Sequence, residues 1–275
     1  MSGIFDKKSI SEYFAGSPMI LSRGIKAIAF DEIDSTNAEA RRYALGHPEA
    51  SSQVTVFVAR SQSAGRGRMG RSFFSPAGSG LYLTELFDAS KMSAEQLLCL
   101  TPAAAVATLR TVRLLGADNA AIKWVNDIYI DGKKVSGILA ESFTVGQKRF
   151  VAIGVGINLY TEAFPEELSN IATSIFGNGE AVKVGEKTKK LLLAAERLAA
   201  ELCDLCAAVR RSELGYMEEY RAASAALGRR VSYVKDGCES FGTATDVDDM
   251  GRLSVTDESG RTVLLSGGEI SLFLK

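Results

Sequence analysis

The spacing of hydrophobic residues divides the chain into a long part that mixes helices and strands and a short part made of strands. Apolar residues at every second position, or in short unbroken runs, predict strands, whereas recurrence every three or four positions predicts helices. In the longer part, the pattern predicts helices at 10–14, 37–45, 93–115, 187–210 and 212–226, and strands at 25–31, 53–60, 81–87, 121–125, 127–130, 134–142 and 150–159.

Local signals mark several of the expected element ends. Ser93, with Gln96 three positions later, forms a capping box at a helix start. Pro102 should kink that helix or restart it, and Gly116 should end it. The Asp131-Gly132 pair between two predicted strands is a strong signal for a tight β-hairpin.

The character of the sequence changes after Gly228. Short β runs separated by glycine and aspartate fill the remaining chain, a pattern typical of a small β-barrel. We therefore predict two domains, residues 1–226 and residues 227–275, with no internal repeat.

Composition and charge narrow the class of protein. Hydrophobic residues make up 46% and charged residues 24% of the chain, and the net charge of −1 gives no general attraction to a polyanion such as DNA. The N-terminus does not resemble a secretory signal, and we see no run of about 18 apolar residues that would predict a membrane span. Four scattered cysteines in 275 residues predict reduced thiols and hence a cytoplasmic protein.

Cys203 and Cys206 form a C-x-x-C pair inside a stretch with the pattern of an amphipathic helix. We interpret them as small hydrophobic residues that pack in the interior. A redox or metal role is the alternative, although no second Cys/His pair completes a zinc set.

A loop rich in glycine and arginine, residues 61–80, is the first candidate for chemistry. Its segment 65–70 satisfies G-x-G-x-x-G, but a strand follows the loop, whereas a dinucleotide fold needs a helix there. No kinase motif accompanies it. Glycines let backbone N–H groups approach phosphate, and the guanidinium groups of Arg66, Arg68 and Arg71 can bind its oxygens. The alternative is a solvated basic turn.

A second candidate is the strand around Lys123, where a lysine lies between apolar neighbours. Alternation places Lys123 and Val125 on one face and Ile122 and Trp124 on the other. A buried lysine needs an anionic partner, which could be a ligand carboxylate or phosphate, an internal acid, or water at the strand end.

Four segments taken together closely resemble biotin–protein ligases, in order and in spacing. They are Asp34-Ser35-Thr36-Asn37, the glycine–arginine run 62–71, Lys123-Trp124-Val125-Asn126-Asp127 with Lys134-Val135-Ser136-Gly137-Ile138-Leu139, and Gly154-Val155-Gly156-Ile157-Asn158. The tail Gly267-Gly268-Glu269-Ile270-Ser271-Leu272 also resembles the C-terminal domain of this family.

The resemblance implies roles for the matching positions. It implies that biotin contacts Ser35, Thr36, Asn37, Gln62, Gly65, Arg66, Gly67, Lys123 and Gly137, and that the nucleotide contacts Arg68, Arg71, Phe74, Asn126 and Asn158. Lys123 and Arg68 would be the catalytic cations, with Lys123 bridging the biotin carboxylate and the α-phosphate. Asp127 and Glu141 could hold Mg²⁺ or pair with basic residues, and the metal ligands stay open.

The same resemblance implies the fold and the reaction. The fold would be α+β, a mixed sheet backed by helices as in the class II synthetase-like biotin and lipoate ligases, followed by a small SH3-like barrel. The enzyme would activate biotin with ATP, using Mg²⁺, to biotinyl-5′-AMP and transfer biotin to a lysine of a biotin carboxyl carrier protein. Only residues 1–33 precede the first motif, so we expect the monofunctional type without DNA binding. A monomer and a homodimer both remain open.

Two positions depart from the family pattern. Val125 stands where proline is common, and Phe73 stands where tryptophan is common. Three other functions stay open at this point: a lipoate or octanoate ligase or transferase, a biotin-sensing repressor, and a plain nucleotide-binding module.

Overall fold

The computed structural model describes residues 5–47, 53–177, 183–235 and 237–273, which form two sheets with helices around the larger one. The helices are α1 (Lys7–Gly16), α2 (Pro18–Ser22), α3 (Thr36–Gly46), α4 (Ala94–Leu114), α5 (Val184–Arg210) and α6 (Tyr216–Ala222). The strands of the larger sheet are β1 (Lys26–Ile33), β2 (Thr55–Gln62), β3 (Gly80–Asp88), β4 (Ala121–Lys123), β5 (Asp127–Ile130), β6 (Lys133–Val145) and β7 (Lys148–Asn158).

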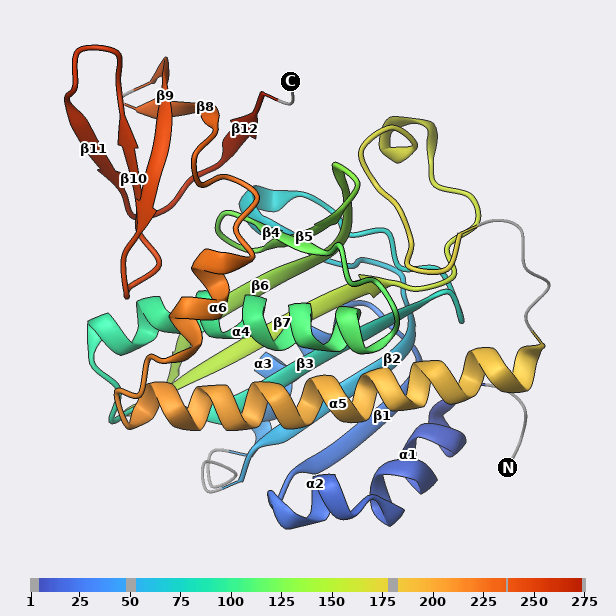
Figure 1. The fold of residues 1–275 in the computed structure, drawn as a ribbon. Helices are drawn as coiled ribbons and strands as arrows, with labels where there is room; N and C mark the ends of the chain where they lie inside the picture. The colour runs from blue at the N-terminus through green and yellow to red at the C-terminus, as the bar shows by residue number, and fades with distance from the viewer. Residues whose placement is uncertain (1–4, 48–52, 178–182, 236, 274–275) are drawn as a thin grey trace.

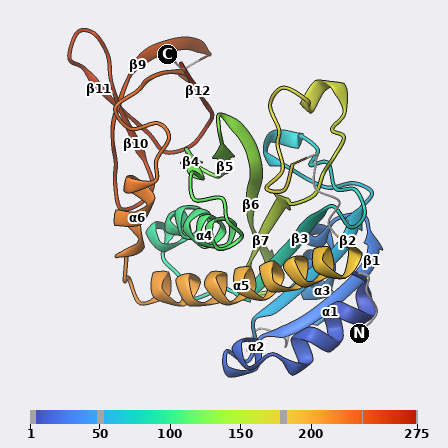
Figure 2. The same ribbon diagram turned by 45° about the vertical axis from the view of Figure 1, so that its right-hand side comes forward.

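The larger sheet is mixed and has seven strands in the order β1-β2-β3-β7-β6-β5-β4. Only the β1–β2 pair is parallel, and the other neighbours are antiparallel. The long helices α4 and α5 cover one face of this sheet, while α3 lies on the other (Figures 1 and 2). The fold is therefore the predicted α+β arrangement of a mixed sheet backed by helices.

Most predicted elements are confirmed within a few residues, and one prediction about a helix is wrong. The capping box of Ser93 and Gln96 opens α4 as expected, and Gly116 follows its end with a φ of +102°. Pro102, however, lies inside α4, which continues to Leu114 without restarting. A proline removes one backbone hydrogen bond, and here the helix is held by its buried face and by the barrel turn that meets Pro102 at Gly251.

The apolar character of α4 needs one further comment. By length and composition alone α4 could cross a membrane, a feature that the sequence reading did not expect. In the fold, 67% of its most apolar window is buried against the sheet and the neighbouring helices, as in the core helix of a soluble protein.

The C-terminal strands form a separate antiparallel sheet of five strands in the order β11-β10-β9-β8-β12, an SH3-like arrangement. Its strands are β8 (Arg230–Lys235), β9 (Cys238–Val247), β10 (Leu253–Thr256), β11 (Thr262–Leu265) and β12 (Ile270–Leu272). The β9–β10 turn is fastened to the larger part of the protein. The Trp124 indole N–H donates to the Gly251 carbonyl at 2.8 Å, and Arg221 donates to the Val247 carbonyl at 2.6 Å.

The cysteines behave as packing residues. Cys206 is buried in the core on α5, and Cys203 packs beside it. Burial raises the pKa of the Cys203 thiol to about 12, which keeps it protonated and unreactive. Among the described residues, no group of three or more His, Cys, Asp or Glu side chains is arranged to hold a metal ion.

Glu85, at the centre of β3, is the most unusual charged residue in the core. It is fully buried, and neither carboxylate oxygen has a hydrogen-bond partner among the described residues. Burial raises the pKa of Glu85 from 4.5 to about 8, so the folded protein keeps this carboxyl protonated at neutral pH.

This raised pKa predicts a pH dependence of stability. The unfolded chain releases the proton of Glu85 near pH 4.5, whereas the folded chain holds it until about pH 8. The contribution is therefore fully present below the lower value and is lost as pH rises through this window. We expect Glu85→Gln to remove up to about 3 kcal/mol of the fall in unfolding free energy between about pH 5 and about pH 8, measured by urea unfolding. Glu218→Gln, at an exposed position, is the control. An unchanged pH slope in Glu85→Gln would exclude Glu85 as the titrating group.

Candidate functional site

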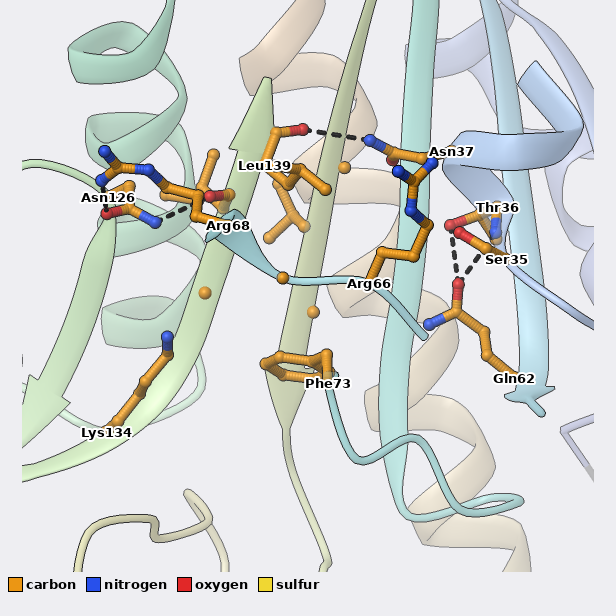
Figure 3. Close-up of a pocket in the computed structure, with 16 residues that line it drawn as sticks. Ser35, Thr36, Asn37, Gln62, Arg66, Arg68, Phe73, Asn126, Lys134 and Leu139 are labelled. Carbon is orange, nitrogen blue, oxygen red and sulfur yellow. Dashed lines mark hydrogen bonds between the residues drawn. The ribbon is translucent and has the colours of Figure 1, made fainter. Parts of the chain in front are cut away.

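A first cavity lies where the start of α3, the end of β2 and the glycine–arginine loop meet strands β6 and β7. Figure 3 shows its polar side chains in two groups: Ser35, Thr36, Asn37 and Gln62 at one end, and Arg68, Asn126 and Lys134 at the other, with the ring of Phe73 between them. The cavity is lined by Ser35, Thr36, Asn37, Gln62, Arg66, Gly67, Arg68, Phe73, Asn126, Lys134, Gly137, Ile138, Leu139, Gly154, Val155 and Gly156.

The helix start of α3 supplies the polar end of this cavity. Ser35 caps the helix by accepting the backbone N–H of Ala38. The backbone N–H of Thr36 donates to Gln62 Oε1 at 2.8 Å, and Gln62 Nε2 donates to Ser75 Oγ at 2.9 Å. These bonds fix α3, the end of β2 and the loop relative to one another, so the polar groups are held in place before any ligand arrives.

Asp34 stabilises the approach to the same helix. It forms a two-pronged ion pair with Arg42, with distances of 2.7 and 2.9 Å. The hydrogen bonds from Arg42 lower the pKa of Asp34 to about 2, and the carboxylate therefore stays charged at all physiological pH values.

Glycines on β6 and β7 form the floor of the cavity. Gly137 pairs with Gly156, and Leu139 pairs with Gly154, across the two antiparallel strands. A Cβ atom on Gly156 would collide with the ring of Phe73, and one on Gly154 would collide with Asn37 Oδ1. The absence of side chains at these positions lets Phe73 and Asn37 lie directly on the sheet.

The glycine–arginine loop folds into a tight turn above this floor. Gly67 N–H donates to the Arg71 carbonyl at 2.7 Å, and Phe73 N–H donates to the Gly65 carbonyl at 2.9 Å. At Gly65 a Cβ would collide with the Phe73 carbonyl, so only glycine allows the two arms of the loop to approach so closely. The turn points the arginines out of the loop, where their guanidinium groups can reach a ligand.

A second cavity continues from the first and lies under the barrel. Phe74 and Phe164 form an apolar wall with ring centroids 6.3 Å apart, and Leu168 and Ile171 extend it. The barrel contributes Gly268, Glu269 and Ile270. The remaining lining residues are Gly67, Arg68, Arg71, Ser72, Phe73, Lys123, Trp124, Asn126, Asp127, Tyr129, Lys134, Asn158 and Ala172.

Two lysines lie at different places in this pair of cavities. Lys134 lines both cavities, and its Nζ lies 2.7 Å from Asp127 Oδ1. Lys123 lines only the second cavity, and its Nζ lies 3.3 Å from the hydroxyl of Tyr129. The expectation that Lys123 contacts a ligand in both cavities therefore disagrees with the geometry, because its strand, β4, lies at the far edge of the sheet.

The arginines tie the loop to the rest of the site. Arg68 donates to Asn126 Oδ1 at 2.7 Å and to the Gly268 carbonyl of the barrel at 3.3 Å. Arg71 pairs with Glu269 at 2.7 Å, which gives the loop a second contact with the barrel. The loop, the sheet and the barrel therefore meet at the second cavity.

The structure brings together nearly all residues that the sequence singled out. The first cavity includes Ser35, Thr36, Asn37, Gln62, Arg66, Gly67 and Gly137, and the second includes Arg68, Arg71, Phe74, Asn126 and Asn158. Gly65 lines neither cavity and acts by closing the loop.

Sequence reasoning gave no role to several residues that the geometry places at the site. Lys134, Gly154 and Gly156 lay in quoted motifs, and their spacing could have suggested a role. The apolar wall around Phe164 and the barrel residue Glu269 had no local signal, because only the tertiary fold brings them to the cavity.

Comparisons with known proteins agree with this site. The model of the biotin/lipoate A/B protein ligase family matches residues 29–158, and that of the biotin protein ligase C-terminal domain matches residues 226–272. The biotin–[acetyl-CoA-carboxylase] ligase of Mycobacterium tuberculosis is 36% identical over 241 residues, which cover 86% of this chain and 85% of the relative.

Solved structures show the same fold. The biotin protein ligase from Aquifex aeolicus in complex with biotin and ATP has a TM-score of 0.70 and 24% identity, covering 91% of this chain and 99% of that chain. The Leishmania major enzyme in complex with biotinyl-5-AMP has a TM-score of 0.53 and 26% identity, covering 89% of this chain and 99% of that chain. With its matched domains, its relatives and its fold in agreement, the chain belongs to the biotin protein ligase family.

Proposed function

We propose that the two joined cavities hold the two substrates of a biotin protein ligase, biotin in the first cavity and ATP in the second. As a member of this family, the chain is an enzyme that activates biotin with ATP to biotinyl-5′-AMP and transfers biotin to a lysine of a carrier protein. The position of Lys134 in both cavities is the observation that carries the assignment of the two substrates.

The first cavity suits the biotin ring system and its acid chain. Ser35, Thr36 and Gln62 supply hydrogen-bonding groups at the closed end for a polar ureido ring. The glycine floor and Phe73 supply the apolar surface that the rest of the molecule needs. A carboxylate at the open end of the chain would then lie near Lys134 and Arg68.

The second cavity suits the nucleotide. Phe74 and Phe164 form a wall against which adenine can pack, and Asn158 adds a polar group. Arg68 and Arg71 approach from the loop to meet the phosphates. Lys123, which lines this cavity alone, fits a contact to the nucleotide better than a bridge between the substrates.

We assign the bridging role to Lys134 in place of Lys123. In the first step, a biotin carboxylate oxygen attacks the α-phosphorus of ATP and pyrophosphate leaves. Negative charge increases on the phosphoryl oxygens at that point. A cation that reaches both substrates lowers the repulsion between carboxylate and phosphate and stabilises this charge, and Lys134 and Arg68 occupy such a place.

Asp127 is the residue best suited to hold Mg²⁺. Magnesium often binds through one or two carboxylates together with substrate phosphates and water, so a cage of acidic residues is not required. Asp127 lines the second cavity, whereas Glu141 is engaged with Asn37 and Arg66 beside the first. When bound, Mg²⁺ would neutralise phosphate charge.

In the second step, the amine of the carrier lysine attacks the carbonyl carbon of the mixed anhydride and AMP leaves. The adenylate has to be kept from water until the carrier arrives. The glycine–arginine loop and the barrel meet over the second cavity and can provide this cover. A biotin carboxyl carrier domain would therefore dock at the loop side of the site.

The remaining assignments belong to the same proposal. Residues 1–226 would carry the catalytic site, and residues 227–275 would close it. The enzyme would act in the cytoplasm, as a monomer or homodimer, without binding DNA. Nothing in the site itself calls for a second subunit, because all lining residues described here come from one chain.

Biotin-dependent exchange of radioactive pyrophosphate into ATP tests this function directly. We expect exchange with biotin and none with lipoate, since the polar end of the first cavity offers hydrogen bonds that a dithiolane ring cannot satisfy. Exchange with lipoate alone would retain the fold but overturn the assignment of the first cavity. No exchange with either acid, in protein shown to be folded, would contradict the proposed activity.

The two lysines give the sharpest test of the geometry. Lys134→Gln should lower the exchange rate by about 100-fold or more and raise the KM values for both biotin and ATP, because it removes a charge shared by both substrates. Lys123→Gln, the matched control, should raise the KM for ATP and leave that for biotin within about twofold. If Lys123→Gln affects biotin as strongly as Lys134→Gln does, the bridging role belongs to Lys123.

The contact between loop and barrel predicts the accessibility of the loop. The Arg71–Glu269 pair is largely exposed, so Glu269→Gln should weaken loop closure by about 1 kcal/mol or less. Trypsin should then cleave after Arg66, Arg68 or Arg71 about two to five times faster, as measured by mass spectrometry. Glu258→Gln, which loses a pair with Arg230 inside the barrel, is the control. Equal cleavage rates in the two variants would exclude Glu269 as a contact that restrains the loop.

A further inference from the structure

Glu141 lies next to the first cavity without lining it. It is on β6, two residues beyond Leu139, and its side chain is 31% exposed. Each carboxylate oxygen has its own partner: Oε2 accepts Asn37 Nδ2 at 2.9 Å, and Oε1 lies 3.5 Å from Arg66 Nη2. Glu141 therefore joins the start of α3 to the root of the glycine–arginine loop.

The contacts of Glu141 determine which way the Asn37 amide faces. Asn37 Nδ2 also donates to the Leu139 carbonyl at 3.2 Å (Figure 3). Both of these partners, a carboxylate and a carbonyl, can only accept hydrogen bonds, so the amide nitrogen has to face them. Asn37 Oδ1 is thereby turned toward Thr84 Oγ1, which lies 2.7 Å away. The single hydroxyl proton of Thr84 is then donated to Asn37.

The same reasoning continues to Thr36. Thr84 Oγ1 and Thr36 Oγ1 are 2.8 Å apart, and since the Thr84 proton is already used, Thr36 has to donate to Thr84. The other acceptor near the Thr36 hydroxyl is Gln62 Oε1 at 3.1 Å, but that oxygen already accepts the Thr36 backbone N–H at 2.8 Å. With its proton directed to Thr84, the Thr36 hydroxyl offers only lone pairs to the cavity.

We propose that Glu141 is a positioning residue that fixes the Thr36 hydroxyl as a hydrogen-bond acceptor, and so selects a ligand ring that carries an N–H donor at this point. The inference rests on the proposed function, in which the ureido ring of biotin occupies this end of the cavity. A ring oxygen in place of the N–H would bring two acceptors together, and such a mismatch at a buried site is costly.

The surroundings of Glu141 support this arrangement. Arg66 supplies a positive charge beside the carboxylate, which favours the ionised, acceptor-only form. Gly154 leaves the space in which Asn37 Oδ1 lies, since a Cβ there would collide with it. Thr84 is fully buried, so water does not compete for its hydroxyl. The order of donors and acceptors is therefore set by protein groups alone.

The test compares biotin with its two cyclic carbamate analogues, in each of which one ureido N–H is replaced by oxygen. Calorimetry should show that the parent protein prefers biotin over one of them by about tenfold or more. In Glu141→Leu, this preference should fall below about threefold, because Asn37 can turn over and the Thr36 hydroxyl can then donate. The KM for biotin should rise more than kcat falls, and the KM for ATP should stay within about twofold.

Three further variants keep the outcome decisive. Glu141→Gln retains an acceptor for Asn37 and should restore most of the preference. Thr84→Val interrupts the same chain one step later and should lose the preference, which repeats the test if Glu141→Leu does not fold. Glu239→Gln, at an exposed position in the barrel, is the matched control.

The outcomes separate the inference from the function on which it rests. If the folded parent protein does not bind biotin, the proposed function fails. If the parent binds biotin with the expected preference and both Glu141→Leu and Thr84→Val keep that preference, the function stands and the role of Glu141 is overturned.

Discussion

The antiparallel pairing of β6 with β7 is the constraint on which the rest of the site depends. It sets Gly137 opposite Gly156 and Leu139 opposite Gly154, so a strip of sheet without bulky side chains faces the first cavity. Phe73 of the loop rests on this strip, and Asn37 of α3 occupies the space above Gly154. Because both contacts require glycine, the positions of the loop and of the helix start follow from the register of two strands.

The same sheet arranges the charges. A shift of register between Ile128 and Tyr129 pairs Tyr129 with Lys134, and Lys134 reaches Asp127 and the junction of the two cavities. The barrel then closes the second cavity from above, fastened at one side through Trp124 and Arg221 and at the other through Arg68 and Arg71. A reaction between two anions, a carboxylate and a triphosphate, is thereby given cations at one point and cover from water around it.

Much of this arrangement could be predicted from the sequence, and the failures have physical reasons. Helix caps and the Asp131-Gly132 turn are local features, so the element ends were predicted well. Alternation placed Lys123 correctly on the half-exposed face of its strand, but it cannot tell how far along a sheet that strand lies. The shift of register that brings Lys134 to the junction is a tertiary feature, as is the approach of Glu269 to Arg71. Pro102 was misread because burial outweighed the lost hydrogen bond.

The central claim is that one site, joined at Lys134, holds both substrates. A crystal structure with a non-hydrolysable analogue of biotinyl-5′-AMP tests it most directly. The account predicts the bicyclic ring against Ser35, Thr36 and Gln62, the adenine against Phe74, and the phosphate within hydrogen-bond distance of Lys134 and Arg68. A phosphate bound by Lys123 while Lys134 remains on Asp127, or an adenine outside the second cavity, would contradict it.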